Sequence, residues 1–148
     1  MIMKPIKSLY SSYNQNDIYM LERIGPYSII NDNHQGLIVL DSSWNEVKRI
    51  KVDENLFYPE ARYIDYVNNR MLFKLEAFLC LVDIESSGVK LIELPDDLQD
   101  IYFSNLHCFC KDHIMIDTSK NVVSLDLIDF KITVLELASV DEYPFNEY

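Results

Sequence analysis

A block of 29 residues occurs three times in this chain, and this repeat constrains the fold more than any other feature. The copies cover residues 24–52, 66–94 and 109–137, so their starts lie 42 and 43 residues apart. An aspartate recurs at the same place in each copy, as Asp41, Asp83 and Asp126. A β-branched residue follows it six positions later every time. A period of this length is typical of architectures in which each copy forms one supersecondary unit.

Each copy contains three strand-like runs separated by short polar turns. We expect strands over 28–31, 36–41, 47–52, 70–74, 77–83, 89–94, 113–117, 121–126 and 131–137. A further strand is expected before each copy, over 19–22, 61–66 and 101–104. The middle runs are apolar at almost every position, which suits strands buried on both faces, whereas the last runs alternate. Four strands in about 42 residues is the content of one propeller blade.

The repeat resembles β-propeller blades of the WD-repeat or YVTN kind, over residues 24–137 and more loosely from residue 9 onward. It departs from WD repeats in lacking their Gly-His and Trp-Asp signatures. The resemblance implies an all-β fold of three four-stranded antiparallel blades, a half or open propeller, because closed propellers usually have four to eight. A β-sandwich or β-barrel is the alternative. The aligned aspartates are expected to be scaffold residues that cap the turn after a strand.

Length and composition set the class of protein. The 148 residues suit a single domain, 1–148, that ends in an acidic and aromatic tail over 138–148. Three glycines leave no glycine-rich phosphate loop. We find no secretory signal pattern and no apolar run near the roughly 18 residues that a membrane helix needs. The three cysteines, an odd number, fit a reducing compartment, so we expect a soluble cytoplasmic protein.

The net charge of −11 is unevenly distributed. Residues 1–80 contain nine Lys or Arg and ten Asp or Glu, whereas residues 81–148 contain four and fourteen. Such an acidic half repels nucleic acid and anionic lipid and attracts basic proteins. Solubility alone is the other explanation for acidity of this kind. We therefore expect a basic protein partner, with no direct contact to nucleic acid or membrane.

Two acidic segments, 95–102 and 141–148, place carboxylates beside aromatic rings. Aromatic anchors are enriched at interfaces, and complementary charge speeds association. Such a surface could imitate nucleic acid in the cleft of a nuclease. A solvated loop and a frayed terminus are the structural alternatives. The predicted partner-binding residues are Asp96, Asp97, Asp100, Tyr102, Asp112, Asp117, Asp141, Glu142, Tyr143, Phe145, Glu147 and Tyr148.

The segment 107–113, His-Cys-Phe-Cys-Lys-Asp-His, is the one cluster of soft metal ligands in the sequence. Cysteines two apart on a strand share a face, so Cys108 and Cys110 could hold a metal with His113. A structural zinc site normally needs four ligands, and nothing nearby resembles a catalytic cysteine motif. We favour buried structural cysteines, with Cys80 in an apolar run, and predict no metal, no cofactor and no catalytic residue.

Size, acidity and the lack of catalytic motifs make the chain similar to immunity proteins of bacterial toxin–immunity systems, of the contact-dependent growth inhibition type. The similarity implies a non-enzymatic inhibitor that neutralises a basic toxin, such as a nuclease, by occluding its active-site cleft with an acidic surface. The alternative is a scaffolding propeller fragment that homodimerises to close a six-bladed ring. An enzyme with an acidic central channel is the third hypothesis.

Overall fold

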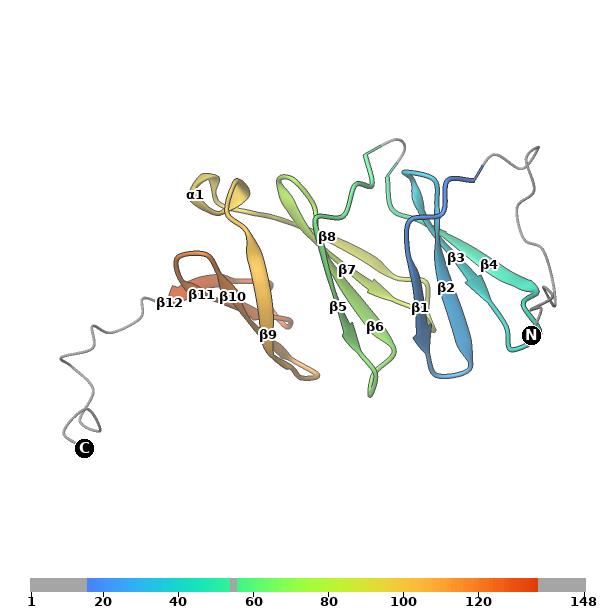
Figure 1. Cartoon of the computed structure of the whole chain (residues 1–148). Helices are drawn as coiled ribbons and strands as arrows, with labels where there is room; N and C mark the ends of the chain where they lie inside the picture. The colour runs from blue at the N-terminus through green and yellow to red at the C-terminus, as the bar shows by residue number, and fades with distance from the viewer. Residues whose placement is uncertain (1–15, 54–55, 136–148) are drawn as a thin grey trace, which may run out of the picture. The chain divides into compact units, whose positions relative to one another are not determined.

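The computed structural model describes residues 16–53 and 56–135, which form twelve strands and one short helix (Figure 1). The strands form three four-stranded sheets, each built from strands that follow one another in the chain. The first sheet contains β1 (Leu21–Ile24), β2 (Tyr27–Asp32), β3 (Gly36–Leu40) and β4 (Glu46–Lys51). The second contains β5 (Ala61–Asp65), β6 (Arg70–Lys74), β7 (Phe78–Asp83) and β8 (Val89–Glu93). The third contains β9 (Phe103–Phe109), β10 (His113–Thr118), β11 (Val122–Asp126) and β12 (Ile132–Leu135), and α1 (Asp96–Gln99) precedes it.

The expected fold class is confirmed: the described chain is all-β, with three antiparallel blades and no closure into a barrel. Eleven of the twelve strands lie where the repeat predicts them, within about two residues at each end. The exception is β9, which we expected over 101–104 but which begins at Phe103 and continues to Phe109. Two register shifts in its pairing with β10 make β9 longer than a regular partner strand. Such bulges have no clear signal in a single sequence.

The aligned aspartates cap turns, as predicted. Asp41 Oδ1 accepts hydrogen bonds from the backbone N–H groups of Ser43 and Asn45, both at 2.9 Å. Asp83 Oδ1 accepts one from the Ser86 N–H at 2.9 Å. Asp126 Oδ1 accepts two, from the N–H groups of Ile128 at 2.7 Å and Asp129 at 3.1 Å. A side chain that satisfies the turn backbone in this way fixes the hairpin between the third and fourth strands of each blade.

The predicted burial of the middle strands is also seen. All five residues of β3 are buried, and Leu79, Cys80 and Val82 of β7 are buried as well. The fourth strands alternate, since Ile50 of β4 is buried between two exposed neighbours. This contrast between buried middle strands and half-exposed last strands is what the sequence pattern indicated.

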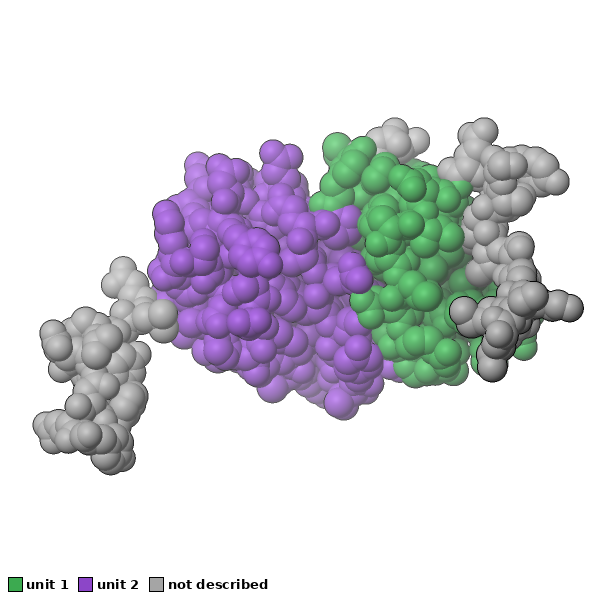
Figure 2. All heavy atoms as spheres, in the orientation of Figure 1, with its two compact units in different colours: residues 1–58, 82–89 green, residues 59–81, 90–148 purple. Residues whose placement is uncertain are grey.

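The density of internal contacts divides the chain into two compact units (Figure 2). Unit 1 contains residues 1–58 and 82–89, and unit 2 contains residues 59–81 and 90–148. Unit 1 has a small cluster of Ile30, Ile38 and Leu40 against Trp44. Unit 2 has a larger apolar core, made by Tyr63, Leu72, Leu79, Ile92, Leu94, Leu98, Phe103, Ile114, Ile116, Val123 and Leu125.

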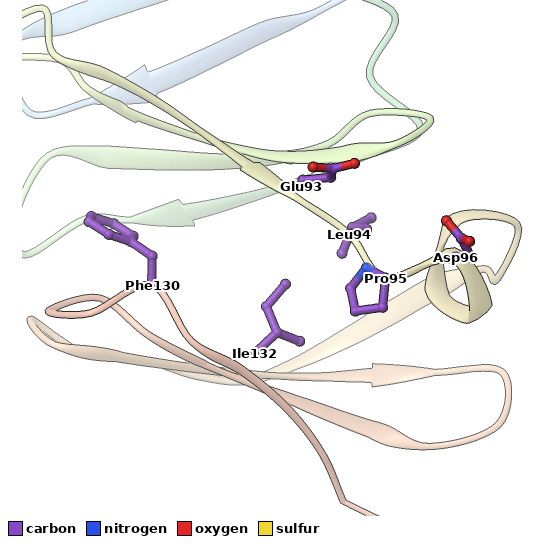
Figure 3. A pocket seen from close by; sticks show the side chains of 6 residues that line it. All are labelled: Glu93, Leu94, Pro95, Asp96, Phe130 and Ile132. Atoms are coloured by element: carbon purple, nitrogen blue, oxygen red, sulfur yellow. The ribbon is translucent and has the colours of Figure 1, made fainter.

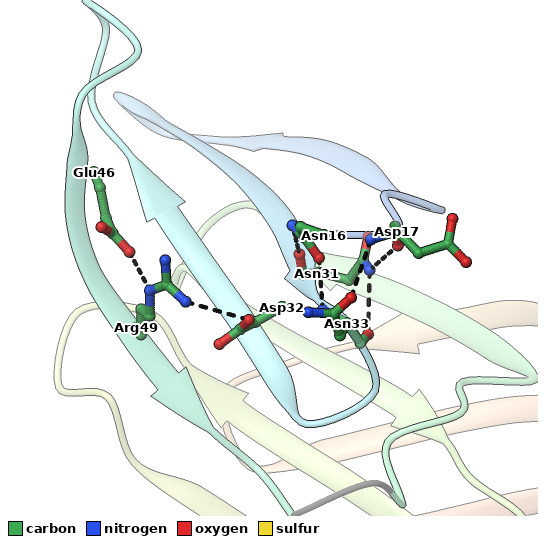
Figure 4. A network of polar contacts seen from close by, with 7 residues as sticks. All are labelled: Asn16, Asp17, Asn31, Asp32, Asn33, Glu46 and Arg49. Atoms are coloured by element: carbon green, nitrogen blue, oxygen red, sulfur yellow. Dashed lines mark hydrogen bonds and ion pairs between the residues drawn. The ribbon is translucent and has the colours of Figure 1, made fainter. Parts of the chain in front are cut away.

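A polar network in unit 1 joins the segment before β1 to β2 (Figure 4). The buried side chain of Asn31 is at its centre: Oδ1 accepts from the Tyr19 N–H at 2.8 Å, and Nδ2 donates to the Asp17 carbonyl at 2.7 Å. Nearby, Arg49 pairs with Asp32 at 3.3 Å and with Glu46. A buried amide with both of its ends satisfied stabilises one conformation, so we assign this network to the fold rather than to a binding site.

Candidate functional site

An open pocket of about 520 Å³ lies within unit 2, between the segment that follows β8 and the β11–β12 hairpin (Figure 3). It is lined by Glu93, Leu94, Pro95, Asp96, Phe130 and Ile132. Two carboxylates and one aromatic ring therefore border a depression that is otherwise aliphatic. Of the predicted partner-binding residues, Asp96 is the one that the pocket contains.

The acidic side of the pocket is held by backbone and core contacts. The Leu94 N–H donates to the Ala77 carbonyl at 2.9 Å, and the Leu94 side chain is buried in the core. Pro95 then precedes the single turn of α1, whose Leu98 is buried. The Gln99 amide Nε2 donates back to the Leu94 carbonyl at 3.0 Å. This segment is therefore an anchored connection, not a loose loop.

The buried side chain of Lys74 holds the C-terminal end of α1 in place. Its side chain is 1% exposed, and its Nζ donates to the Gln99 carbonyl at 2.6 Å, to the Glu76 carbonyl at 3.1 Å and to Glu60 Oε2 at 2.7 Å. The ammonium also lies 5.8 Å from the centre of the Phe103 ring. A buried ammonium needs all three donors satisfied, and here they are. Lys74 is thus a structural cation that orders the acidic connection.

The aromatic side of the pocket comes from the β11–β12 turn. Phe130 has a φ of 58°, a left-handed conformation that is unusual for a bulky side chain. The Asp126 cap and a hydrogen bond from the Lys131 N–H to Asp129 Oδ1, at 2.9 Å, support this turn. The Nζ of Lys90 lies 4.8 Å from the centre of the Phe130 ring. The ring therefore already attracts one cation of the chain itself.

The remaining predicted residues fall into three groups. Asp97, Asp100 and Tyr102 belong to the same connection as Asp96 and are exposed, Tyr102 to 70%. Asp112 is exposed in the β9–β10 turn, and Asp117, toward the other end of β10, pairs with His107 at 2.7 Å. The structure does not bring these last two aspartates to the pocket. Asp141, Glu142, Tyr143, Phe145, Glu147 and Tyr148 lie outside the described residues.

Among the pocket residues that were not predicted, Glu93 and Phe130 provide the second carboxylate and the aromatic ring. Glu93 lies two residues before the acidic segment 95–102 and is exposed on the alternating strand β8, which was a usable signal. Phe130 carried no usable signal, because its approach to Glu93 depends on how β8 and the β11–β12 hairpin pack.

A buried ion pair joins β6 to the β9–β10 turn. Arg70 Nη2 lies 2.7 Å from Asp65 Oδ2 and also donates to the Cys110 carbonyl at 2.7 Å, while Nη1 donates to the Lys111 carbonyl at 3.0 Å. Burial by itself raises the pKa of Asp65, but hydrogen bonds from Arg70 and Asn68, with the charge of Arg70, outweigh it and lower the pKa below its usual value. Asp65 is therefore ionised at neutral pH and serves as a structural anion.

The three cysteines differ in exposure. Cys80 is buried, as predicted, and burial raises the pKa of its thiol to about 12, which makes it unreactive. Cys108 is half-buried and Cys110 is exposed, so the interpretation of all three as buried residues is wrong for Cys110. The reason is that β9 ends at Phe109, and Cys110 already belongs to the turn. In the described ranges no three His, Cys, Asp or Glu side chains form a group that could hold a metal ion.

The described part of the chain has no helix long and apolar enough to cross a membrane.

Neither a protein-family model nor a curated protein matches the sequence. Solved structures do match. The extracellular domain of a putative one component system from B. thetaiotaomicron is similar over 88% of this chain, with a TM-score of 0.62 and 9% identity. Streptogramin B lyase matches over 82% with a TM-score of 0.60 and 12% identity, and a HIRA fragment over 79% with 0.56 and 11%.

The fold is of the β-propeller type. This chain spans only 18%, 41% and 39% of those three proteins, respectively. At this identity the likeness concerns the fold alone, and one of the three is by name a lyase.

Proposed function

We propose that this chain is a non-enzymatic protein-binding module, and that the pocket of unit 2 receives a basic side chain of its partner. The observation that carries the proposal is the position of Glu93 and Asp96 at the rim of a pocket that also contains the Phe130 ring. Carboxylates pair with guanidinium groups through charge-assisted hydrogen bonds, and aromatic faces attract the same cation. Arginine fits both features better than lysine, because its guanidinium is planar and weakly hydrated.

The surroundings of the pocket favour the same kind of partner. Asp97 and Asp100 are exposed close to it in sequence, and the second half of the chain carries most of the net charge. A field of this sign raises the association rate of a basic protein, and the rate falls as salt is added. Lys90 beside Phe130 is an internal cation that a partner arginine must displace or accompany.

A finer version of the proposal is an immunity protein whose acidic surface occludes the active-site cleft of a basic toxin, such as a nuclease. The uneven charge and the exposed Tyr102 support this version, since mimicry of nucleic acid needs both negative charge and aromatic rings.

The proposal is tested with a short arginine-containing peptide as the probe, titrated into the full chain by calorimetry at low salt. The variant Glu93→Gln/Asp96→Asn should weaken binding about tenfold, or about 1.4 kcal/mol. The matched control Asp17→Asn/Glu76→Gln removes the same charge from two exposed residues that do not line the pocket. If both variants weaken binding equally, the attraction is a general effect of charge and the pocket is not the site.

A second candidate function is a scaffolding fragment that homodimerises. It is favoured by the number of described sheets, three, because closed propellers usually contain four to eight blades. Light scattering after gel filtration distinguishes the two functions: a stable dimer without any partner supports scaffolding, and a monomer at micromolar concentration contradicts it.

A further inference from the structure

Sulfur-containing side chains gather at the end of the β9–β10 hairpin. The strand register pairs Cys108 with Met115, and the Cys110 N–H donates to the His113 carbonyl at 2.8 Å. Residues opposite one another in an antiparallel pair lie on the same face, as do residues two apart on one strand. Cys108 and Met115 therefore share one face of the third sheet, and Cys110 follows at the start of the turn, two residues after Cys108.

This face is not the one that packs in the core of unit 2. Ile114 and Ile116, which alternate with Met115 along β10, are both buried in that core. Met115 and Cys108 are half-buried on the opposite face, and Cys110 is exposed. A small ion from solvent can therefore reach both thiols.

Cys108 and Cys110 are neighbouring thiols, separated in the sequence by Phe109 alone. Their spacing suits a bridging ion better than a disulfide. Cys110 follows β9 directly, and residues two apart in extended backbone have Cα atoms about 6.6 Å apart, near the upper limit of about 6.8 Å for a disulfide. Two metal–sulfur bonds of about 2.3 Å each reach further than one sulfur–sulfur bond of about 2.0 Å.

The ligand set decides which ion fits. A structural zinc ion takes four ligands, but in the part of the chain that the structure describes no third His, Cys, Asp or Glu joins the two thiols. Thiolate and thioether together select soft ions such as Cu(I), which accept fewer ligands. We propose that Cys108 and Cys110, with Met115 across the strand pair, form a binding site for a soft monovalent metal ion, Cu(I) or its analogue Ag(I).

The hairpin is held in place before any ion arrives. Arg70 donates to the carbonyls of Cys110 and Lys111, and Asp65 fixes Arg70 in turn. A rigid turn lowers the entropy lost when two thiols converge on one ion. From the sequence we expected no metal, because a Cys-x-Cys pair alone is a weak signal and a structural zinc site normally needs four ligands.

Competition for Cu(I) alone against a coloured Cu(I) chelator, under anaerobic reducing conditions, tests the proposal. The full chain should bind one equivalent, and Cys108→Ser/Cys110→Ser should lower the affinity at least 100-fold. Met115→Leu, which keeps the volume of the side chain, should lower it about tenfold. Cys80→Ala removes the buried thiol and should leave the affinity unchanged, with circular dichroism confirming that each variant is folded.

Equal affinity of the wild-type chain and the double serine variant would overturn the proposal. An unchanged Cu(I) stoichiometry in the double serine variant, together with a loss of Cu(I) binding in Cys80→Ala, would also overturn it. Tighter binding of Zn(II) than of Cu(I), each corrected for its own chelator, would overturn the assignment to a soft monovalent ion.

Discussion

Replacement of Arg70 by methionine tests how strongly the ion pair with Asp65 stabilises unit 2. The variant keeps most of the side-chain volume but removes the guanidinium. Asp65 then remains as a carboxylate whose side chain is 2% exposed, and the carbonyls of Cys110 and Lys111 lose their donor. An uncompensated buried charge is far more costly than the net gain from forming the pair.

The expected loss follows from what Asp65 retains. Removing one partner of a buried pair costs about 3–5 kcal/mol. Asp65 still accepts hydrogen bonds from the N–H groups of Val67 and Asn68, both at 3.1 Å, and from the Asn68 amide at 2.9 Å. These three hydrogen bonds still stabilise the charged carboxylate, so we expect a loss at the lower end of that range, about 3 kcal/mol of unfolding free energy.

Urea unfolding followed by far-ultraviolet circular dichroism measures this loss. Arg23→Met, at an exposed position of β1, is the control and should change the free energy of unfolding by less than about 0.5 kcal/mol. The double variant Asp65→Asn/Arg70→Met should be more stable than the sum of the two single losses predicts, by about 2 kcal/mol. A loss below about 1 kcal/mol for Arg70→Met, or additive single losses, would refute the reasoning.

Two further predictions concern pH and packing. Because the folded pKa of Asp65 is lowered, the unfolded state binds more protons between the folded pKa and the usual value near 3.8. The stability advantage of the wild-type chain over Asp65→Asn should therefore be full at pH 7 and shrink below about pH 4, which urea titrations at both pH values measure; an advantage that grows at low pH contradicts this sign. Gly36→Ala places a Cβ 2.1 Å from the Ile50 carbonyl oxygen, so the backbone must shift and about 2 kcal/mol of stability should be lost. Gly88→Ala places a Cβ 3.2 Å from the Ser86 hydroxyl, a side-chain atom that can move, and 4.0 Å from the Asp83 Cβ, so it should cost less than about 0.5 kcal/mol; equal losses in both variants argue against the steric cause.

Local signals made most of the fold predictable. Asp41, Asp83 and Asp126 each cap a turn within four residues of themselves, and such a turn needs no distant partner to form. The alternation of β4 and the continuous apolar run of β3 likewise report burial directly. By contrast, the length of β9 depends on bulges in its pairing with β10. No local sequence pattern predicts such bulges.

The candidate site was predictable only in part. Asp96 was identified because acidic residues cluster in its segment, but Phe130 reaches the same pocket from a turn 34 residues later in the chain. The Arg70 contacts with Cys110 and Lys111 and the burial of Lys74 were not foreseen either. Each of these contacts joins residues that are distant in the sequence, and one sequence alone does not show which distant residues meet.

The sequence by itself determined the repeat, the order of the strands, the capped turns and the concentration of negative charge in the second half. These properties follow from hydrophobic period, turn chemistry and composition, which act over a few residues. Only the tertiary structure decided which carboxylates border the pocket, which cation is buried, and that Met115 lies opposite Cys108. The physical reason is that side chains from separate strands meet only after the register and the packing of the sheets are set, and those depend on the whole unit.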